Sequence, residues 1–533
     1  MRRPKLEFTR VFLLIIGLFG AGCEQCGEAA QGGIERGRDG LEMGRDGLER
    51  GRDGLERGAD ALLHGRDRGP SEDASPPPPE REGNRARLLI NGEASFLERM
   101  RMIDSAERSI HIQALIFKAD TAGGAIADRL IERKRENPEL DIRVIVDAYA
   151  NIQDYDAQML YFELMDAGIE VQGYEPLYLE WMNEINTEDW TAGNKRYHEK
   201  YFVVDGERAI VGGMNIGDEY ARIGTDAALI WRDQDVYLEG PVVADISRAF
   251  DENFRYFQSV QERRPPMLES DGYWRAWRHV HPGLRDAVTR SVGRDRSWRS
   301  HPRAPFDTES LEARAVSSAL LPDVSVQFIR SRPRLRERWI DEAYRREIAA
   351  AERSIVIVNA YFIPTPRLRA ALLAAARRGV DVTVITNSKA TNDIPMINDA
   401  GRIHYGPLMD AGVHIYEWHA EQHGEGTVHA KFAVFDSEVA IIGSYNLDPR
   451  SLALNSEDVV VIRDARLATE LHERVMHTDA RFASRITEAQ AEQWSDPSLL
   501  PPMDSVPQVP FWHPNFDSDR FELFLIRQAA RNL

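Results

Sequence analysis

Two stretches of the chain carry the same four polar residues at the same spacing. The first reads YHEKYFVVDGERAIVGGMN and the second reads VHAKFAVFDSEVAIIGSYN. The members of each pair lie 231 positions apart, and the pairs are His198 and His429, Lys200 and Lys431, Asp205 and Asp436, and Asn215 and Asn446. A lone His-x-Lys string arises by chance and usually marks a surface strand, whereas two complete copies at matched spacing indicate a duplicated site.

These residue types suit the cleavage of a phosphodiester. Side chains alternate along a strand, so the His and Lys of each copy would point to the same face. If the two copies face each other, one imidazole can attack phosphorus while the other protonates the leaving oxygen. The two lysines and the two asparagine amides can hold the phosphoryl oxygens as charge shifts in the transition state. This chemistry requires no metal or other cofactor, and the sequence contains no convincing cluster of metal ligands.

An attacking imidazole must keep one nitrogen free, so a carboxylate should hold the other nitrogen. Glu457 stands at the head of the apolar strand in LNSEDVVVI, and Asp233 holds the matching place in WRDQDVYLEG, with Asp235 as its alternate. We therefore expect Asp233 and Glu457 to orient the two histidines. Asp205 and Asp436 complete the motif and belong to the catalytic set, although residues at a strand–turn boundary suit structural roles better than proton transfer.

The surrounding sequence alternates helices and strands in two similar runs. The string ERSIHIQALIF in the first run returns as ERSIVIVNAYF in the second, and each follows an amphipathic helix. This alternation favours an α/β layered fold, and the repetition indicates an internal duplication. We place one domain at residues 86–260 and the other at 324–483, with an Arg-rich segment (261–323) between them and a Pro-rich tail (484–533) after them.

Residues 1–23 have the pattern of an export signal. Four basic residues precede the apolar run VFLLIIGLFGAG, which is shorter than the ~20 residues of a spanning helix. The run ends at Cys23 in GAGC, which resembles the lipobox of bacterial lipoproteins, where the cysteine is lipidated. We expect a lipid anchor on Cys23 that holds the protein to the periplasmic side of the bacterial cell envelope. The alternatives are an ordinary secretory signal, which would release the protein, and an uncleaved short anchor.

Residues 24–85 have the composition of a tether. The string GRDGLEx recurs every seven residues, with one leucine and two glycines in each repeat. One apolar residue per heptad is half of a coiled-coil seam, and each glycine weakens a helix by ~1 kcal/mol. A flexible or weakly helical spacer therefore fits better than a partner-binding helix, and Pro76–Pro79 would stiffen its end.

Charge and cysteine content exclude several classes of protein. The formal net charge is −19, which argues against tight nucleic-acid binding because such binding depends on Lys and Arg. A local basic channel remains compatible with this total. The two cysteines, Cys23 and Cys26, both lie near the N-terminus, so the body has no disulfide framework and no Cys-based zinc site.

The paired H-x-K-x-x-x-x-D motifs resemble those of the phospholipase D superfamily, over residues 86–483. The strings GGMNIGDEY, WRDQDVYLEGPVV and GSYNLDPRSLALNSE are similar to bacterial cardiolipin synthases, and TNSKATND and NLDPRS are most similar to the branch that uses phosphatidylethanolamine as well as phosphatidylglycerol. The lipoprotein-like start and the repeat tether depart from that pattern, because cardiolipin synthases often carry transmembrane helices or none.

The resemblance implies two similar α/β sandwich domains related by a pseudo-twofold axis, with one active site shared between them. It also implies a covalent phosphohistidine on His198, with His429 as general acid and then base. The acceptor would be the hydroxyl of a second phospholipid. The partners would then be phospholipid substrates and a membrane surface, with no nucleic acid. One chain would contain the complete catalytic unit, whatever the oligomeric state of the protein.

Three other functions compete with the phosphatidyltransferase. A hydrolytic phospholipase D would pass the same group to water and release phosphatidic acid. A nuclease of the same superfamily is disfavoured by the acidity and the export signal, and a catalytically silent binding protein is disfavoured by two intact motifs. The aromatic segment 175–190 and the Arg-rich stretch 263–303 could contact a membrane, or they could be a packed loop and a solvated linker.

Overall fold

The computed structural model describes residues 74–147, 155–174, 196–223, 230–262, 306–393, 395–419 and 426–494. Five predicted features lie wholly or mainly outside the described residues. They are the signal with Cys23, the repeat part of the tether, the aromatic segment 175–190, the Arg-rich stretch 263–303, and the tail from residue 495.

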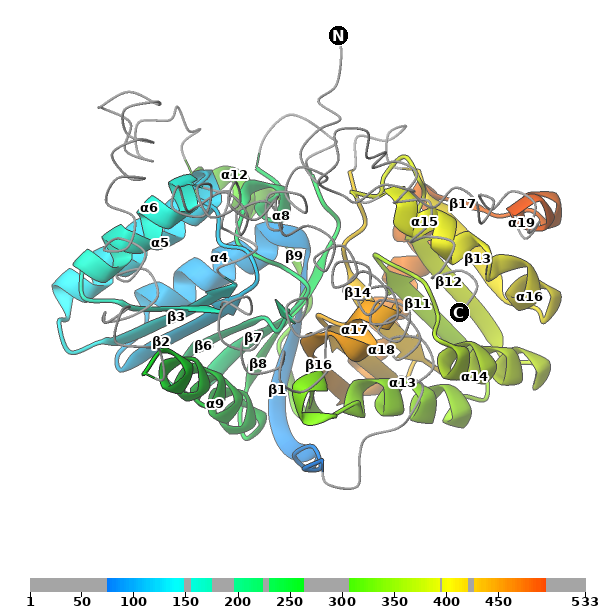
Figure 1. Cartoon of the computed structure of the whole chain (residues 1–533), viewed down its shortest axis with the longest axis horizontal. Coiled ribbons are helices and arrows are strands. Elements are labelled where there is room, and N and C mark those ends of the chain that lie inside the picture. The colour runs from blue at the N-terminus through cyan, green and yellow to red at the C-terminus, as the bar shows by residue number, and fades with distance from the viewer. Residues whose placement is uncertain are drawn as a thin grey trace, which may run out of the picture. The chain divides into compact units, whose positions relative to one another are not determined.

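The N-terminal half runs from β1 to α9 (Figure 1). Its strands are β1 (Arg81–Ile90), β2 (Ser109–Ala114), β3 (Asp141–Asp147), β4 (Glu170–Tyr174), β5 (Arg196–Tyr197), β6 (Tyr201–Val204), β7 (Arg208–Gly212) and β8 (Gln234–Glu239). Its helices are α4 (Asn91–Asp104), α5 (Thr121–Glu136), α6 (Tyr155–Asp166), α8 (Asp218–Ala221) and α9 (Val242–Glu262). The strands pair in the order β4–β3–β2–β6–β7–β8–β1, in which β2, β3 and β4 are parallel.

The C-terminal half repeats this plan. Its strands are β10 (Leu321–Ser331), β11 (Ser354–Asn359), β12 (Asp381–Asn387), β13 (His414–Trp418), β14 (Lys431–Phe435), β15 (Val439–Gly443), β16 (Asn455–Arg463) and β17 (Ala483–Arg485). Its helices are α13 (Trp339–Ala350), α14 (Pro366–Arg377), α15 (Pro395–Arg402), α16 (Tyr405–Asp410), α17 (Pro449–Ala453), α18 (Ala465–His477) and α19 (Glu488–Trp494), with short 3-10 turns at Pro333–Leu335 and Asp479–Phe482. The pairing order is β10–β16–β15–β14–β11–β12–β13–β17, which mirrors the first half.

The two sheets join edge to edge through β1 and β10, which run antiparallel. The connecting residues also return to the N-terminal half, because α12 (Thr308–Arg314) contacts α4 and β9 (Val316–Ser317) pairs with β1. Backbone hydrogen bonds connect β8, β1, β10 and β16 in succession, so the two halves form one continuous sheet.

Three apolar cores hold this arrangement. One buries side chains of both halves together with α9 and α18, and it includes Val236 and Val434. A second lies under α4, α5 and α6, and a third lies under α13, α14 and α16. Figure 1 shows the strands β2, β3 and β6 between α4–α6 on one side and α9 on the other. Burial on both faces explains why these strands read as apolar runs.

The prediction of two similar α/β domains is confirmed. The helices and strands that the repeated strings predict appear as α4–β2–α5–β3 and α13–β11–α14–β12. Some boundaries differ from the predicted ones. The first strand begins at Arg81, inside the predicted tether, because its polar residues pair with β8 and β10. Likewise α19 lies inside the predicted tail, and its Ala491 is buried in the third core.

Candidate active site

The two histidines lie on segments that cross from one half to the other. His198 follows β5, which pairs with β16, and its backbone N–H donates to the Ser456 carbonyl at 2.8 Å. His429 precedes β14, and its N–H donates to the Arg232 carbonyl at 2.7 Å. Each motif is therefore positioned by backbone of the opposite half, and the two motifs share one interface.

A buried carboxylate holds each imidazole. His198 Nδ1 lies 2.7 Å from Glu457 Oε2, and His429 Nδ1 lies 2.7 Å from Asp233 Oδ2. Both carboxylate side chains are fully buried. The acid for each histidine comes from the other half, so neither half alone would complete either pair. The sequence singled out both carboxylates but could not assign them to their histidines.

Burial and the carboxylates together fix the protonation of the site. Burial lowers the pKa of His198 to about 4, against the opposing effect of Glu457. Burial and the nearby Lys431 lower the pKa of His429 as well. Burial alone would raise the pKa of Glu457 and Asp233, but the paired histidines hold both pKa values below normal. The arrangement favours a neutral ring with its proton on Nδ1 and a free electron pair on Nε2.

Both motif lysines are buried beside their histidines. Lys200 Nζ donates to the His198 carbonyl at 2.6 Å, and Lys431 Nζ contacts the His429 carbonyl and lies 2.8 Å from His429 Nδ1. Burial lowers the pKa of Lys200 to about 8 and that of Lys431 to about 7. A bound phosphate dianion or diester would supply the negative charge that restores these ammonium groups.

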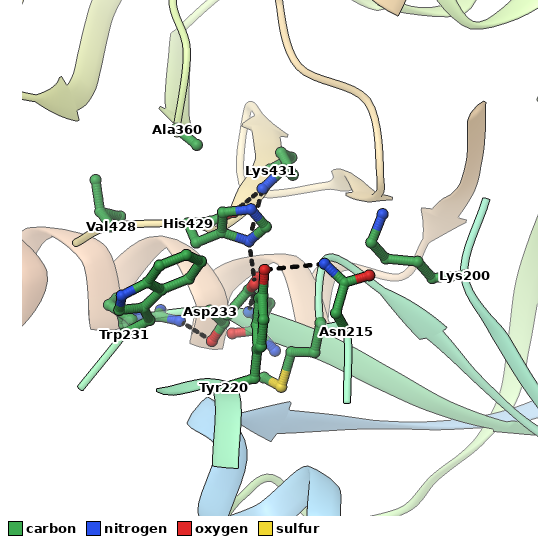
Figure 2. Close-up of polar contacts among 12 residues, drawn as sticks. Lys200, Asn215, Tyr220, Trp231, Asp233, Ala360, Val428, His429 and Lys431 are labelled. Carbon is green, nitrogen blue, oxygen red and sulfur yellow. Dashed lines mark hydrogen bonds and ion pairs between the residues drawn. The ribbon is translucent and has the colours of Figure 1, made fainter. Parts of the chain in front are cut away.

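The two motif asparagines have different surroundings. Asn215 accepts the Ile116 N–H at 3.2 Å and donates through Nδ2 to the Tyr220 hydroxyl at 2.9 Å. Asn446 is buried, and its Oδ1 accepts no hydrogen bond from the described residues. Figure 2 shows Asn215 between Tyr220 and Lys200.

Asp205 and Asp436 lie at the turns that follow β6 and β14, and they bind backbone. Asp205 accepts the N–H groups of residues 107–109, at 2.7 Å from Arg108 N, and Asp436 accepts those of residues 352–354, at 2.7 Å from Arg353 N. These contacts fasten the start of β2 and of β11 to the strand that carries each motif. The structure therefore does not bring these two members of the predicted catalytic set to the imidazoles.

The alternate candidate, Asp235, also faces away from the histidines. It accepts the Ser95 hydroxyl at 2.5 Å and pairs with Arg99 at 3.0 Å. Residues two positions apart would share a face within a strand. The two carboxylates differ because β8 begins at Gln234, so Asp233 lies outside the strand and turns toward His429. Asp458, next to Glu457, accepts the Lys200 backbone N–H at 2.9 Å, and burial raises its pKa well above normal.

Several residues that the sequence did not single out surround the two imidazole–carboxylate pairs. Ser444, Ser451 and Asn455 donate to Glu457 at 2.5, 2.9 and 3.2 Å. Tyr220 and Trp231 contact the ring of His429, with ring centroids 5.3 and 5.0 Å away (Figure 2). The motif spacing of 231 residues relates Tyr220 to Ser451 in the sequence, whereas Trp231 and Asn455 do not align at that spacing.

Two buried ion pairs fix the crossing segments. Arg232, next to Asp233, pairs with Asp479 of the C-terminal half at 2.8 Å. Glu199, between His198 and Lys200, pairs with Arg330 of β10 at 3.1 Å, and Asn253 of α9 donates to Glu199 at 2.7 Å. Both pairs therefore span the halves within a few residues of a motif histidine.

Within the described residues, no group of three His, Cys, Asp or Glu side chains has the arrangement of a metal site. The helices of the same residues also include none that is long and apolar enough to cross a membrane.

Comparison with known proteins matches residues 100–254 and 344–478 to the family described as "Cardiolipin synthase, PLD-like domain". Cardiolipin synthase 1 of Bacillus cereus is 26% identical over 401 residues, covering 75% of this chain and 67% of that protein. Cardiolipin synthase 2 of Bacillus anthracis is 30% identical over 373 residues, covering 70% of this chain and 60% of that protein. Cardiolipin synthase A of Pseudomonas fluorescens is 29% identical over 412 residues, covering 77% and 71%.

Among solved structures, the phosphatidylserine synthase of Haemophilus influenzae superposes with a TM-score of 0.54 at 17% identity. The match covers 75% of this chain and 87% of that one, and at this identity it describes the fold alone.

Proposed function

This chain belongs to the cardiolipin synthase-like branch of the phospholipase D superfamily, and from that premise we propose that it transfers a phosphatidyl group between phospholipids. The donor is phosphatidylglycerol, phosphatidylethanolamine or both, and the acceptor is the hydroxyl of a second phospholipid. The reaction passes through a covalent phosphohistidine. The observation that carries the proposal is the pair of imidazoles, each with its Nδ1 held at 2.7 Å by a buried carboxylate from the other half.

In the first step, the electron pair of His198 Nε2 attacks phosphorus and forms a P–N bond. The bond from phosphorus to the leaving oxygen breaks, and that oxygen takes a proton from His429. The pKa of about 4 keeps His198 neutral and therefore nucleophilic at physiological pH. Burial and Lys431 lower the pKa of His429, whereas the Asp233 carboxylate opposes them and favours the cation that the acid requires.

In the second step, an acceptor hydroxyl gives its proton to His429 and forms a new O–P bond. The P–N bond breaks with its electron pair returning to His198, so the enzyme regains its starting state. Lys200, Lys431 and the two motif asparagines hold the non-bridging oxygens through both steps. Because the carboxylates cross between the halves, one chain supplies every group that these steps use.

Hydrolysis to phosphatidic acid is the second candidate, because water could replace the lipid hydroxyl in the second step without any other change. The buried His–Lys pairs serve both outcomes equally, so the products must distinguish them.

We also propose that Cys23 carries a lipid that anchors the protein to the periplasmic face of the cell envelope. The sequence GAGC after an apolar run supports this placement. The tether that precedes β1 would then let the two halves reach lipids at the membrane surface.

Vesicles of phosphatidylglycerol, with and without phosphatidylethanolamine, test the lipid reaction. The full-length protein would be incubated with them, and the products would be identified by mass. We expect cardiolipin from the wild type and none from His198→Ala or His429→Ala. Phosphatidic acid alone would make the protein a hydrolase, and no lipid turnover by folded wild type would overturn the assignment of lipid substrates.

A further inference from the structure

The internal duplication allows the two histidine environments to be compared position by position. The ladders pair Gly212 with Asp235 and Gly443 with Val459, which makes Asp233 and Glu457 equivalent in register. The same register makes Trp231 equivalent to Asn455. Between Tyr220 and Trp231 the first copy has seven more residues than the second copy has between Ser451 and Asn455. Before that point the constant spacing of 231 residues relates Gly213 to Ser444 and Tyr220 to Ser451.

On the His198 side, all three equivalent positions are polar and bind the carboxylate. Ser444 donates to the same Glu457 oxygen that binds His198, whereas Ser451 and Asn455 donate to the other oxygen. Glu457 therefore has four hydrogen-bond partners, and His198 is held by a saturated polar network.

On the His429 side, the same three positions are aromatic or lack a side chain. A Cβ on Gly213 would lie 2.4 Å from Asp233 Oδ1, so no side chain fits there. Tyr220 meets the His429 ring edge-on, with an interplanar angle of 81°, and Trp231 lies at 33° to it. The centroids of Tyr220 and Trp231 are 4.8 Å apart, so the three rings form one cluster (Figure 2).

From this contrast we infer that Tyr220 and Trp231 are specificity-determining residues, which favour a lipid hydroxyl over water as the acceptor at His429. The inference rests on the proposed function, in which His429 takes the acceptor proton. Trp231 is only half-buried, whereas Tyr220 is buried.

Water and an alcohol differ in the number of polar partners that they need beside the imidazole and in the apolar surface that they can place against the rings. A water held at His429 Nε2 needs two to four polar partners, and the neighbouring ring faces offer it none. An alcohol uses one O–H for the imidazole and can cover the rings with its carbon atoms, which gains roughly 25 cal/mol for each Å² of apolar surface removed from water. The polar set around His198 would not discriminate in this way.

The duplication also suggests the test, which is Trp231→Asn, the residue that the other copy has at this position. Full-length protein and phosphatidylglycerol vesicles would be used, and the ratio of phosphatidic acid to cardiolipin would be measured. We expect this ratio to rise about tenfold or more, whatever the change in the absolute rate of phosphohistidine formation. Trp339→Asn is the matched control, because Trp339 is also half-buried but lies on α13 outside the site.

A structural role for Trp231 would lower both products together and leave their ratio unchanged, which would overturn the inference. If Trp231→Asn does not fold, Trp231→Leu and Tyr220→Leu replace each aromatic ring beside His429 by a smaller apolar side chain. An unchanged ratio of phosphatidic acid to cardiolipin in both variants would overturn the inference equally. Wild type that makes phosphatidic acid alone would overturn the proposed transfer and the inference together. Wild-type cardiolipin with an unchanged ratio in the folded variants would overturn only the inference.

Discussion

Replacing Glu457 by glutamine should remove the charge that stabilises His198 during attack while nearly preserving side-chain volume. When His198 Nε2 bonds to phosphorus, the ring becomes a cation whose Nδ1–H faces Glu457 Oε2 at 2.7 Å. Glu457→Gln leaves a neutral amide at that place. The amide also has a nitrogen where a carboxylate oxygen accepted, so Ser451 and Asn455 lose the acceptor that Oε1 provides.

The magnitude follows from the geometry of this pair. Two unit charges with centres about 4 Å apart, at an effective dielectric constant of about 20, attract by about 4 kcal/mol. At about 1.4 kcal/mol for each factor of ten, the loss corresponds to roughly a 10³-fold slower first step. If the amide turns its N–H toward His198, the ring must present the wrong tautomer, and the loss would approach about 10⁴-fold, as known for an Asp-to-Asn change in a serine protease triad.

The assay is single-turnover formation of the phosphohistidine with phosphatidylglycerol vesicles, followed by rapid quenching in base. Glu438→Gln is the control, because the Glu438 side chain is exposed and forms an ion pair with Arg353 outside the site, so the rate should not change. Thermal unfolding of both variants would separate lost chemistry from lost folding. A Glu457→Gln rate within about threefold of wild type would refute the assigned role of this carboxylate.

Three further outcomes are expected. Because the pKa of Lys431 is lowered to about 7, its charge is lost as pH rises, and kcat/KM should fall above about pH 7. In a pH–rate profile, Lys431→Arg should shift this fall to higher pH, whatever the absolute rate of the variant. Asp205→Ala and Asp436→Ala should each destabilise the fold in urea titrations by roughly 1–2 kcal/mol, through lost acceptors for backbone N–H groups, and equal unfolding midpoints for variant and wild type would contradict this. The Asp205 contribution should be present above about pH 4 and lost below it, since its pKa is lowered in the folded chain. Arg232→Met should leave Asp479 buried and unpaired and cost roughly 3–5 kcal/mol in the same titration, and a loss below about 1 kcal/mol would be inconsistent with a buried pair.

The sequence predicted most of the helices and strands, and it singled out the two His–Lys pairs that the structure buries between the halves, because both leave local signals. Alternating apolar strands and helices repeat in each half. The first His–Lys string lies directly before β6, and the second runs into β14, whose first residue is Lys431. The same locality explains why Asp205 was expected at a turn. Its backbone φ of 57° lies in the left-handed region, which Asp tolerates better than most residues.

The partners across the two halves could not be predicted, because pairing between distant segments leaves no periodic signal. Glu457 lies closer in sequence to His429, yet it binds His198 across the interface. The start of β1 was missed for a related reason, since Arg81–Arg85 looks like a polar linker until β8 and β10 are placed beside it.

The difference between the two histidine environments was present in the sequence but hidden by a change of spacing. The motif residues keep one constant offset between the copies, and the carboxylates follow another, seven residues shorter, so Trp231 and Asn455 do not align by the first offset. The strand register supplies the correct alignment.

The most direct test of the whole account is to locate the covalent intermediate. Full-length protein would be quenched in base during turnover of phosphatidylglycerol vesicles, and its peptides would be analysed by mass spectrometry. We predict a phosphatidyl adduct on the peptide that contains His198, absent from His198→Ala, with cardiolipin among the lipids of the same sample. An adduct on the His429 peptide, or turnover to cardiolipin by His198→Ala, would contradict the account.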